Sequence, residues 1–153
     1  MTGSCPEFST GVPGGHPYLP TLEVGPEYAA CALSGQTRVS PLLIDCRRDE
    51  EIEAVALPGC LHIPLDELAA RTREGEQALS ARDEPKAAEI LVMCHHGRRS
   101  LYAANTLKAA GFEGARSIVG GIDLWACKVD PTLPRYTKLG SMITLIPPQV
   151  SGD

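Results

Sequence analysis

The chain of 153 residues contains no long apolar run. A membrane-spanning helix needs about 20 consecutive apolar residues, and no stretch of this sequence approaches that length. The first residues also have neither a basic start nor an apolar core, so they do not predict a secretory signal peptide. We therefore expect a cytoplasmic protein that does not bind membranes.

An excess of positive charge is also missing, because the formal net charge is −5. An acidic molecule is a poor partner for nucleic acid or for an acidic membrane surface. The composition is otherwise ordinary, with 43% hydrophobic and 22% charged residues. Together with the length, this composition predicts one soluble domain with a real hydrophobic core.

The six cysteines form no CxxC pair and no spacing typical of a metal site. We therefore predict no metal and no other cofactor. Because no export signal is predicted, we expect free thiols in a reducing compartment. Cys5 falls in a segment rich in proline and glycine, where we expect it to be exposed, and we assign Cys31, Cys60 and Cys127 to packing.

Proline and glycine mark the two ends of the chain. Residues 1–20 predict a flexible N-terminal arm, residues 21–136 predict the folded domain, and residues 137–153 predict a tail that lies on its surface. No internal repeat is visible. The sequence thus indicates a single domain with an extension at either end.

Short apolar runs alternate with amphipathic stretches between these ends. The compact runs at 41–46 and 89–94 predict strands that are buried on both faces. Shorter strands are expected at 21–24, 61–63 and 116–121, and helices at 26–33, from about 65, at 100–110 and at 122–128. Such alternation predicts an α/β fold with a largely parallel sheet covered by helices on both faces.

The strand predicted at 89–94 ends in Cys94, and "HHGRRS" follows it before a helix begins. In parallel α/β sheets, ligands bind beyond the carboxyl ends of the strands. A tight turn into a helix directs backbone N–H groups inward, and the helix dipole adds positive potential. We therefore expect the pKa of the Cys94 thiol to be lowered and an anion to bind above its sulfur.

Each residue after the cysteine has an expected part in this loop. Gly97 allows the sharp turn, Arg98 and Arg99 supply positive charge, and Ser100 suits the N-cap of the helix. His95 and His96 are expected to line the entrance and influence which acceptor binds.

Two other interpretations of this loop carry less weight. Cys94 could simply end a buried strand beside solvated arginines, but several independent features converge on the cradle instead. A Cys-His-His metal site is disfavoured because adjacent side chains are expected to diverge and no second ligand pair has a usual spacing.

Four segments in order resemble the signatures of the rhodanese superfamily: "LLIDCRRDEE", "LPGCLHIPLDEL", "CHHGRRS" and "GGIDLW". The resemblance extends from about Leu22 to Tyr136 and is to a single-domain member. It implies a five-stranded parallel sheet and sulfur transfer through a persulfide on Cys94. It also implies that Asp45 and Arg47 support the loop by charge-assisted hydrogen bonds.

The family's chemistry implies a small sulfur donor, thiosulfate or a low-molecular-weight persulfide. The acceptor would be a thiol, cyanide or a sulfur-carrier protein. In this interpretation the backbone amides of residues 95–99 and the two arginines hold the anionic donor and stabilise the departing charge. Which donor and acceptor are physiological stays open.

The same fold also carries dual-specificity phosphatases, whose loop has one more residue between cysteine and arginine. Here four residues, His95 to Arg98, separate Cys94 from Arg99, and the tighter cradle favours sulfur over a phosphoryl group. The first signature of those phosphatases also contains a cysteine where this chain has Cys46. A redox module that uses a Cys46–Cys94 disulfide is therefore a third hypothesis, against an inert, packed Cys46.

Overall fold

The computed structural model describes residues 19–148. The arm predicted for residues 1–20 lies outside this range apart from its C-terminal end, and so does Cys5. No helix among the described residues is both long and apolar enough to cross a bilayer.

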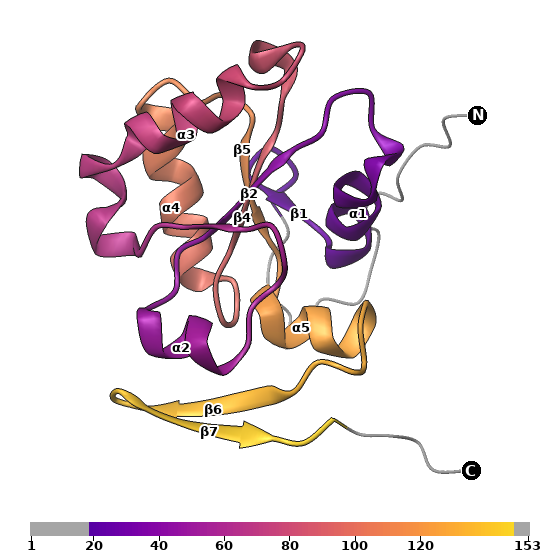
Figure 1. Ribbon diagram of the computed structural model, residues 1–153, viewed down its shortest axis with the longest axis vertical. Coiled ribbons are helices and arrows are strands. Elements are labelled where there is room, and N and C mark those ends of the chain that lie inside the picture. The colour runs from indigo at the N-terminus through magenta and orange to yellow at the C-terminus, as the bar shows by residue number, and fades with distance from the viewer. Residues whose placement is uncertain (1–18, 149–153) are drawn as a thin grey trace.

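Five parallel strands form the centre of the molecule in the order β1-β5-β4-β2-β3 (Figure 1). This arrangement confirms the α/β fold and the five-stranded parallel sheet predicted from the sequence. The strands are β1 (Glu23–Val24), β2 (Leu42–Asp45), β3 (Leu61–His62), β4 (Ile90–Met93) and β5 (Ala115–Ile118).

Helices cover both faces of this sheet (Figure 1). Residues of α3, α4 and η3 belong to one hydrophobic cluster, and residues of α1 and α5 belong to the other. The α-helices are α1 (Pro26–Cys31), α2 (Asp49–Ala54), α3 (Thr72–Ser80), α4 (Arg98–Ala109) and α5 (Gly121–Lys128). The other helical segments are the π-helix η2 (Ala32–Gln36) and the 3₁₀ helices η3 (Leu65–Ala70) and η4 (Pro85–Ala87).

The two compact apolar runs form the middle of the sheet. Every residue of β2 and β4 is buried, because side chains on alternate sides enter the two hydrophobic clusters. The register pairs Asp45 with Met93, so β2 and β4 end side by side. The residues that follow them, Cys46 and Cys94, are therefore neighbours, which the hypothesis of a Cys46–Cys94 disulfide requires.

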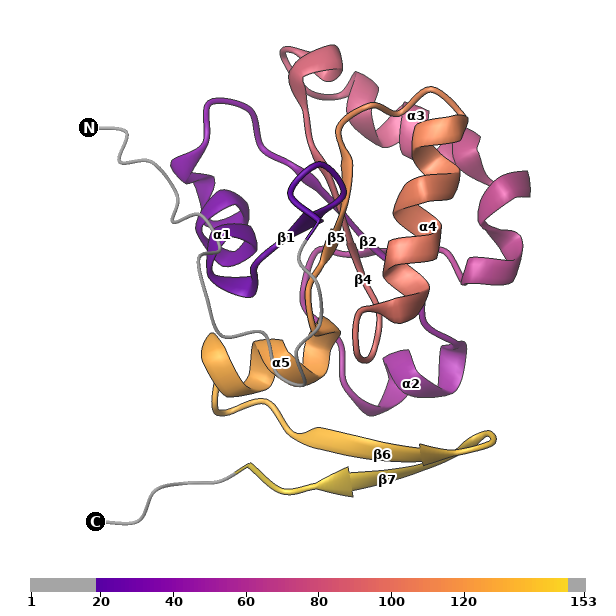
Figure 2. The ribbon, with the colours of Figure 1, turned by 180° about the vertical axis from the view of Figure 1, so that it is seen from behind.

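The segment after α5 forms an antiparallel hairpin of β6 (Arg135–Leu139) and β7 (Met142–Ile146), where the sequence indicated only a surface tail. Figure 2 shows this hairpin across the end of the molecule, below α2 and α5. Tyr136 anchors it, being buried in the cluster that also contains Trp125. The predicted division at residue 136 falls within β6 and stays a prediction.

The start of α5 lies directly against the loop that follows β4. Ile122 N donates a hydrogen bond of 2.8 Å to the Cys94 carbonyl, and Asp123 N donates one of 3.1 Å to the His95 carbonyl. A Cβ atom at Gly121 would lie 2.4 Å from the Cys94 oxygen, and the φ of Gly121 is +59°. Glycine is thus required at this position to let the two segments approach so closely.

We expect Gly121→Ala to destabilise the protein by about 3 kcal/mol, since it adds a steric clash to left-handed backbone strain. Gly140→Ala is the matched control, because Gly140 has a similar φ of +62° with nothing within 4 Å of the added Cβ. This control should cost about 1 kcal/mol. Urea unfolding measures both values, and equal losses would contradict the close approach.

Candidate functional site

Cys94 follows β4 at the carboxyl edge of the sheet, where only 1% of the residue is exposed. A depression opens above it, which we call the mouth. The mouth is lined by Cys94, His95, His96, Gly97, Arg98, Arg99 and Leu101. The structure thus brings the predicted loop residues together around the cysteine.

The Cys94 sulfur is surrounded by hydrogen-bond donors from the start of α4. Gly97 N lies 3.1 Å from it and Ser100 N lies 3.2 Å from it. The Ser100 hydroxyl is also 3.2 Å away and, in turn, lies 2.7 Å from the hydroxyl of Ser117. Because the first N–H groups of a helix have no partner within the helix, these amides are available to a negatively charged sulfur.

These contacts lower the pKa of the Cys94 thiol to about 5. The largest cause is a hydrogen bond from the Cys46 thiol; burial opposes the shift, and bonds from Ser100 and Gly97 add to it. The direction of this shift favours the ionised form of Cys94. A thiolate could act as a nucleophile without a separate general base.

Cys46 lies beside Cys94 at the end of β2, and Cys46 N donates a 3.0 Å hydrogen bond to the Met93 carbonyl. The pKa of the Cys46 thiol is raised, first by its hydrogen bond with Cys94, then by burial and by the charge of Cys94. The opposite directions of the two shifts favour a proton on Cys46 and a negative charge on Cys94.

Arg99 is held by Glu51, a buried carboxylate of α2. The two terminal nitrogens of the Arg99 guanidinium donate to the two carboxylate oxygens of Glu51, at 2.8 Å each. The Tyr136 hydroxyl donates to the same carboxylate at 2.8 Å, and Lys138 Nζ lies 3.5 Å from it. Burial raises the pKa of Glu51, but the bonds from Arg99, Arg48 N and Tyr136 outweigh it and hold that pKa far below its usual range.

Asp45 and Arg47 contact the loop only through other residues, and their expected supporting role stays a prediction. Arg47 is completely buried and pairs with Asp45 at 2.8 Å. The same nitrogen, Nη2, also donates to the Val55 carbonyl at 2.8 Å, and Nη1 donates to the Tyr136 hydroxyl at 3.1 Å. Arg47 therefore fastens the end of α2 and the hairpin, and it affects the loop only through Tyr136 and Glu51.

Ser100 also differs from its expected position. The helix begins at Arg98 with Gly97 as the N-cap residue, at a φ of 96°, so Ser100 lies within the first turn. Its side chain is fully buried and contacts the sulfur instead of capping the helix or facing the mouth. The glycine in the left-handed conformation starts the helix earlier than the expected Ser100 cap would.

His95 and His96 converge, although adjacent side chains were expected to diverge. Their ring centroids are 3.8 Å apart, and the His95 ring also stacks on Tyr136 at 3.9 Å. His95 is buried, which together with the nearby His96 lowers its pKa to about 4. His96 is mostly exposed at the rim of the mouth.

The remaining cysteines follow the sequence prediction only in part. Cys60 is half-buried and packs against a hydrophobic cluster, as expected. Cys31 also packs against that cluster, as expected, but it is disulfide-bonded, which corrects the expectation of free thiols for this residue. Cys127 is exposed, so its assignment to packing was wrong. Cysteine spacing by itself does not reveal which side chains face outward or meet across the fold.

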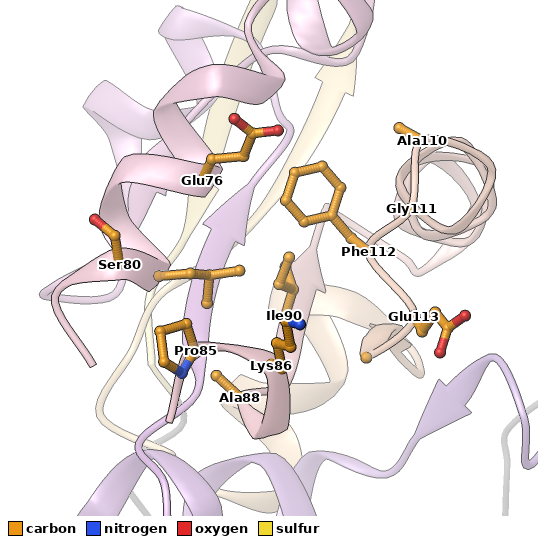
Figure 3. Close-up of a pocket in the computed structure, with 12 residues that line it drawn as sticks. Glu76, Ser80, Pro85, Lys86, Ala88, Ile90, Ala110, Gly111, Phe112 and Glu113 are labelled. Carbon is orange, nitrogen blue, oxygen red and sulfur yellow. The ribbon is translucent and has the colours of Figure 1, made fainter. Parts of the chain in front are cut away.

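A second pocket lies near the amino end of β4, away from Cys94 (Figure 3). Phe112 and Ile90 line its apolar part, with Glu76, Lys86 and Glu113 around them. No cysteine or histidine is among the described residues that line it. None of the residues that line the mouth also lines this second pocket.

Comparison with known families identifies the class of this domain. Residues 28–128 match the rhodanese-like domain. The chain belongs to this family, which confirms the resemblance drawn from the four sequence segments.

Several relatives are sulfurtransferases or sulfur carriers by name. Human thiosulfate:glutathione sulfurtransferase is 32% identical over 111 residues, covering 69% of this chain and 92% of that protein. The solved human single-domain sulfurtransferase TSTD1 shows 32% identity and a TM-score of 0.55, covering 72% of this chain and 98% of that one. The Arabidopsis thaliana adenylyltransferase and sulfurtransferase MOCS3 is 32% identical over 108 residues.

The lengths of the relatives differ greatly. The match covers 66% of this chain but only 23% of MOCS3. It covers 58% of this chain and 43% of the Bacillus subtilis putative sulfur carrier protein YrkF, at 39% identity. This type of domain thus occurs both in short sulfurtransferases and as part of longer proteins.

Sequence analysis assigned no role to Glu51 or Tyr136, although both organise this site. Glu51 ends the "LLIDCRRDEE" segment, where acidic residues are part of the family signature. That signal was present but did not identify Arg99 as the partner. Nothing in the sequence indicated a role for Tyr136, because the hairpin that carries it was not predicted.

We expect Glu51→Gln to lower the free energy of unfolding by about 1–3 kcal/mol, because Arg99 loses its two charge-assisted bonds. The native pKa of Glu51 lies below the unfolded value of about 4.3, so its contribution is complete above that pH and is lost as pH falls. The difference from the unsubstituted protein should therefore shrink in acid. Urea unfolding of both proteins as a function of pH measures this difference in the free energy of unfolding.

Glu53→Gln, at an exposed position in the same helix, is the control and should leave stability unchanged. An equal loss in both variants, or a difference that does not depend on pH, would contradict the assigned role of Glu51.

Proposed function

We propose that this protein transfers a sulfane sulfur through a persulfide on Cys94. The Cys94 thiolate attacks the outer sulfur of thiosulfate, a new S–S bond forms, and sulfite leaves with the electron pair of the broken bond. A thiolate acceptor then attacks the outer sulfur of the persulfide. Cys94 leaves as a thiolate, so the enzyme returns to its starting state.

The observation that carries this proposal is the set of donors around the sulfur. Gly97 N, Ser100 N and the Ser100 hydroxyl all lie within 3.2 Å of it. The same groups that stabilise the thiolate can stabilise the negative charge of a persulfide. The exposed Arg98, at the mouth, supplies positive charge for an anionic donor.

Phosphoryl transfer is less well supported. Four residues separate Cys94 from Arg99, which makes the loop shorter than that of the phosphatases. Arg99 also has both of its terminal nitrogens engaged by Glu51 at 2.8 Å. A phosphoryl group would need such an arginine for its equatorial oxygens.

The names of the relatives suggest where the sulfur comes from and where it goes. The human relative is named for thiosulfate and glutathione, and others are named as sulfur carriers or as combined adenylyltransferases and sulfurtransferases. For this chain we propose thiosulfate or a small persulfide as donor. A low-molecular-weight thiol or a sulfur-carrier protein would be the acceptor, and cyanide would serve in the assay.

Brief treatment of the reduced protein with thiosulfate should add one sulfur atom, as measured by intact mass, and cyanide should remove it as thiocyanate. Cys94→Ala should not gain this sulfur. Cys127→Ala removes an exposed thiol elsewhere and should react like the unsubstituted protein. The rate of sulfur addition should fall as the pH drops through about 5, because the thiolate becomes protonated.

Absence of the adduct, together with hydrolysis of an aryl phosphate that depends on Cys94, would overturn the proposal in favour of a phosphatase. Sulfur addition that survives in Cys94→Ala would place the chemistry on another thiol.

A second candidate function is redox protection, favoured by the contact between Cys46 and Cys94. Hydrogen peroxide would oxidise the Cys94 thiolate to a sulfenic acid, and the Cys46 thiol would displace water from it to form a disulfide. Once Cys94 carries no negative charge, one cause of the raised pKa of Cys46 is gone, and Cys46 becomes a better nucleophile.

Peroxide treatment followed by peptide mapping without reduction should then reveal a Cys46–Cys94 disulfide. Cys46→Ser should accumulate sulfinic acid on Cys94 instead, because no thiol intercepts the sulfenic acid. If sulfinic acid forms on Cys94 equally fast with and without Cys46, this second function is excluded.

A further inference from the structure

Three potential metal ligands meet at the rim of the mouth. His95 and His96 come from the loop after β4, and Asp123 comes from α5. Each residue offers one ligand atom, and these atoms lie within 4.8 Å of one another. Among residues 19–148 no other group of histidine, cysteine and carboxylate side chains meets this condition. Imidazole nitrogens and a carboxylate oxygen are ligands that Zn²⁺ accepts.

The orientation of His95 is fixed in the way that suits a metal ligand. Its Nε2 atom lies 3.0 Å from the Tyr136 carbonyl, which can only accept a hydrogen bond. Nε2 must therefore carry the proton, so the lone pair is on Nδ1. Metal-binding histidines commonly donate their other N–H to a carbonyl in this manner. Stacking on the Tyr136 ring holds the same ring in place.

Asp123 already has a partner, but that partner does not prevent coordination. Arg135 donates to its two oxygens at 2.8 and 2.9 Å. A carboxylate has about four lone-pair positions, so it can accept from Arg135 and bind an ion at once. His96 Nε2 lies 3.8 Å from Asp123 Oδ2, and most of the His96 side chain is exposed and free to adjust.

We propose that His95, His96 and Asp123 bind a divalent transition-metal ion such as Zn²⁺ at the rim of the mouth. Three protein ligands leave a fourth position for water, as in open zinc sites. Because two of the ligands also line the mouth above Cys94, a bound ion obstructs the approach of a sulfur donor. Metal binding at this site therefore inhibits the protein.

The binding test uses untagged full-length protein in which Cys94→Ala removes the reactive thiolate as a competing ligand. Isothermal titration with Zn²⁺ should show one site, and adding His96→Ala or Asp123→Asn should weaken binding at least tenfold. His62→Ala is the matched control, because His62 lies 3.8 Å from Asp49 but has no third ligand. This control should leave Zn²⁺ binding unchanged.

An affinity that is insensitive to both His96→Ala and Asp123→Asn, or one that falls equally in the His62→Ala control, would overturn the proposed site. This measurement does not depend on sulfur transfer, so its failure leaves the proposed function untouched. Conversely, failure of the persulfide assay does not affect the measurement of Zn²⁺ binding.

The inhibitory effect is tested separately in protein that retains Cys94. One equivalent of Zn²⁺ should slow sulfur addition from thiosulfate severalfold, and each variant is compared with itself without metal. His96→Ala should lose this slowing, whereas His62→Ala should keep it. Equal slowing in the His96→Ala variant would show that Zn²⁺ inhibits by binding elsewhere, and it would overturn the inhibitory role.

Discussion

The pairing of Glu51 with Arg99 connects the parts of this molecule that surround Cys94. Glu51 lies in α2, Arg99 in the first turn of α4, and Tyr136, which bonds to the same carboxylate, in β6. Burying a carboxylate is costly unless charge-assisted hydrogen bonds compensate it. The three segments are therefore coupled, because displacing any one of them leaves a buried charge without its partners.

The negative charge favoured on Cys94 is stabilised in a different way from that of Glu51. The positive charge of Arg99 is paired with Glu51. The lowered pKa of Cys94 comes mainly from dipoles instead: the Cys46 thiol, the Ser100 hydroxyl and two backbone amides. Hydrogen bonds to a charged group are stronger in a dry interior than in water. Stabilisation of this kind leaves the positive charge of the exposed Arg98 available to an incoming anion.

The hairpin of β6 and β7 also contacts the residues of the candidate site. Tyr136 contributes its hydroxyl to Glu51, its carbonyl to His95 and its ring to the stack with His95. Arg135 on the same strand pairs with Asp123 at the start of α5. The hairpin thus sets the orientation of the two side chains that border the mouth. Arg135 and Tyr136 therefore contribute contacts to the candidate site, although the hairpin that carries them was not predicted from the sequence.

Local patterns in the sequence determined much of this protein. The buried runs at 41–46 and 89–94, the turn after Cys94 and most of the helices were predictable, because apolar periodicity and turn residues act over a few neighbouring positions. The short helix α2, which carries Glu51, was not predicted. Only the tertiary structure decided that Glu51 meets Arg99, that Tyr136 stacks on His95, and that His95 and His96 converge on Asp123. These contacts join residues from different segments, and their geometry depends on packing that no local pattern encodes.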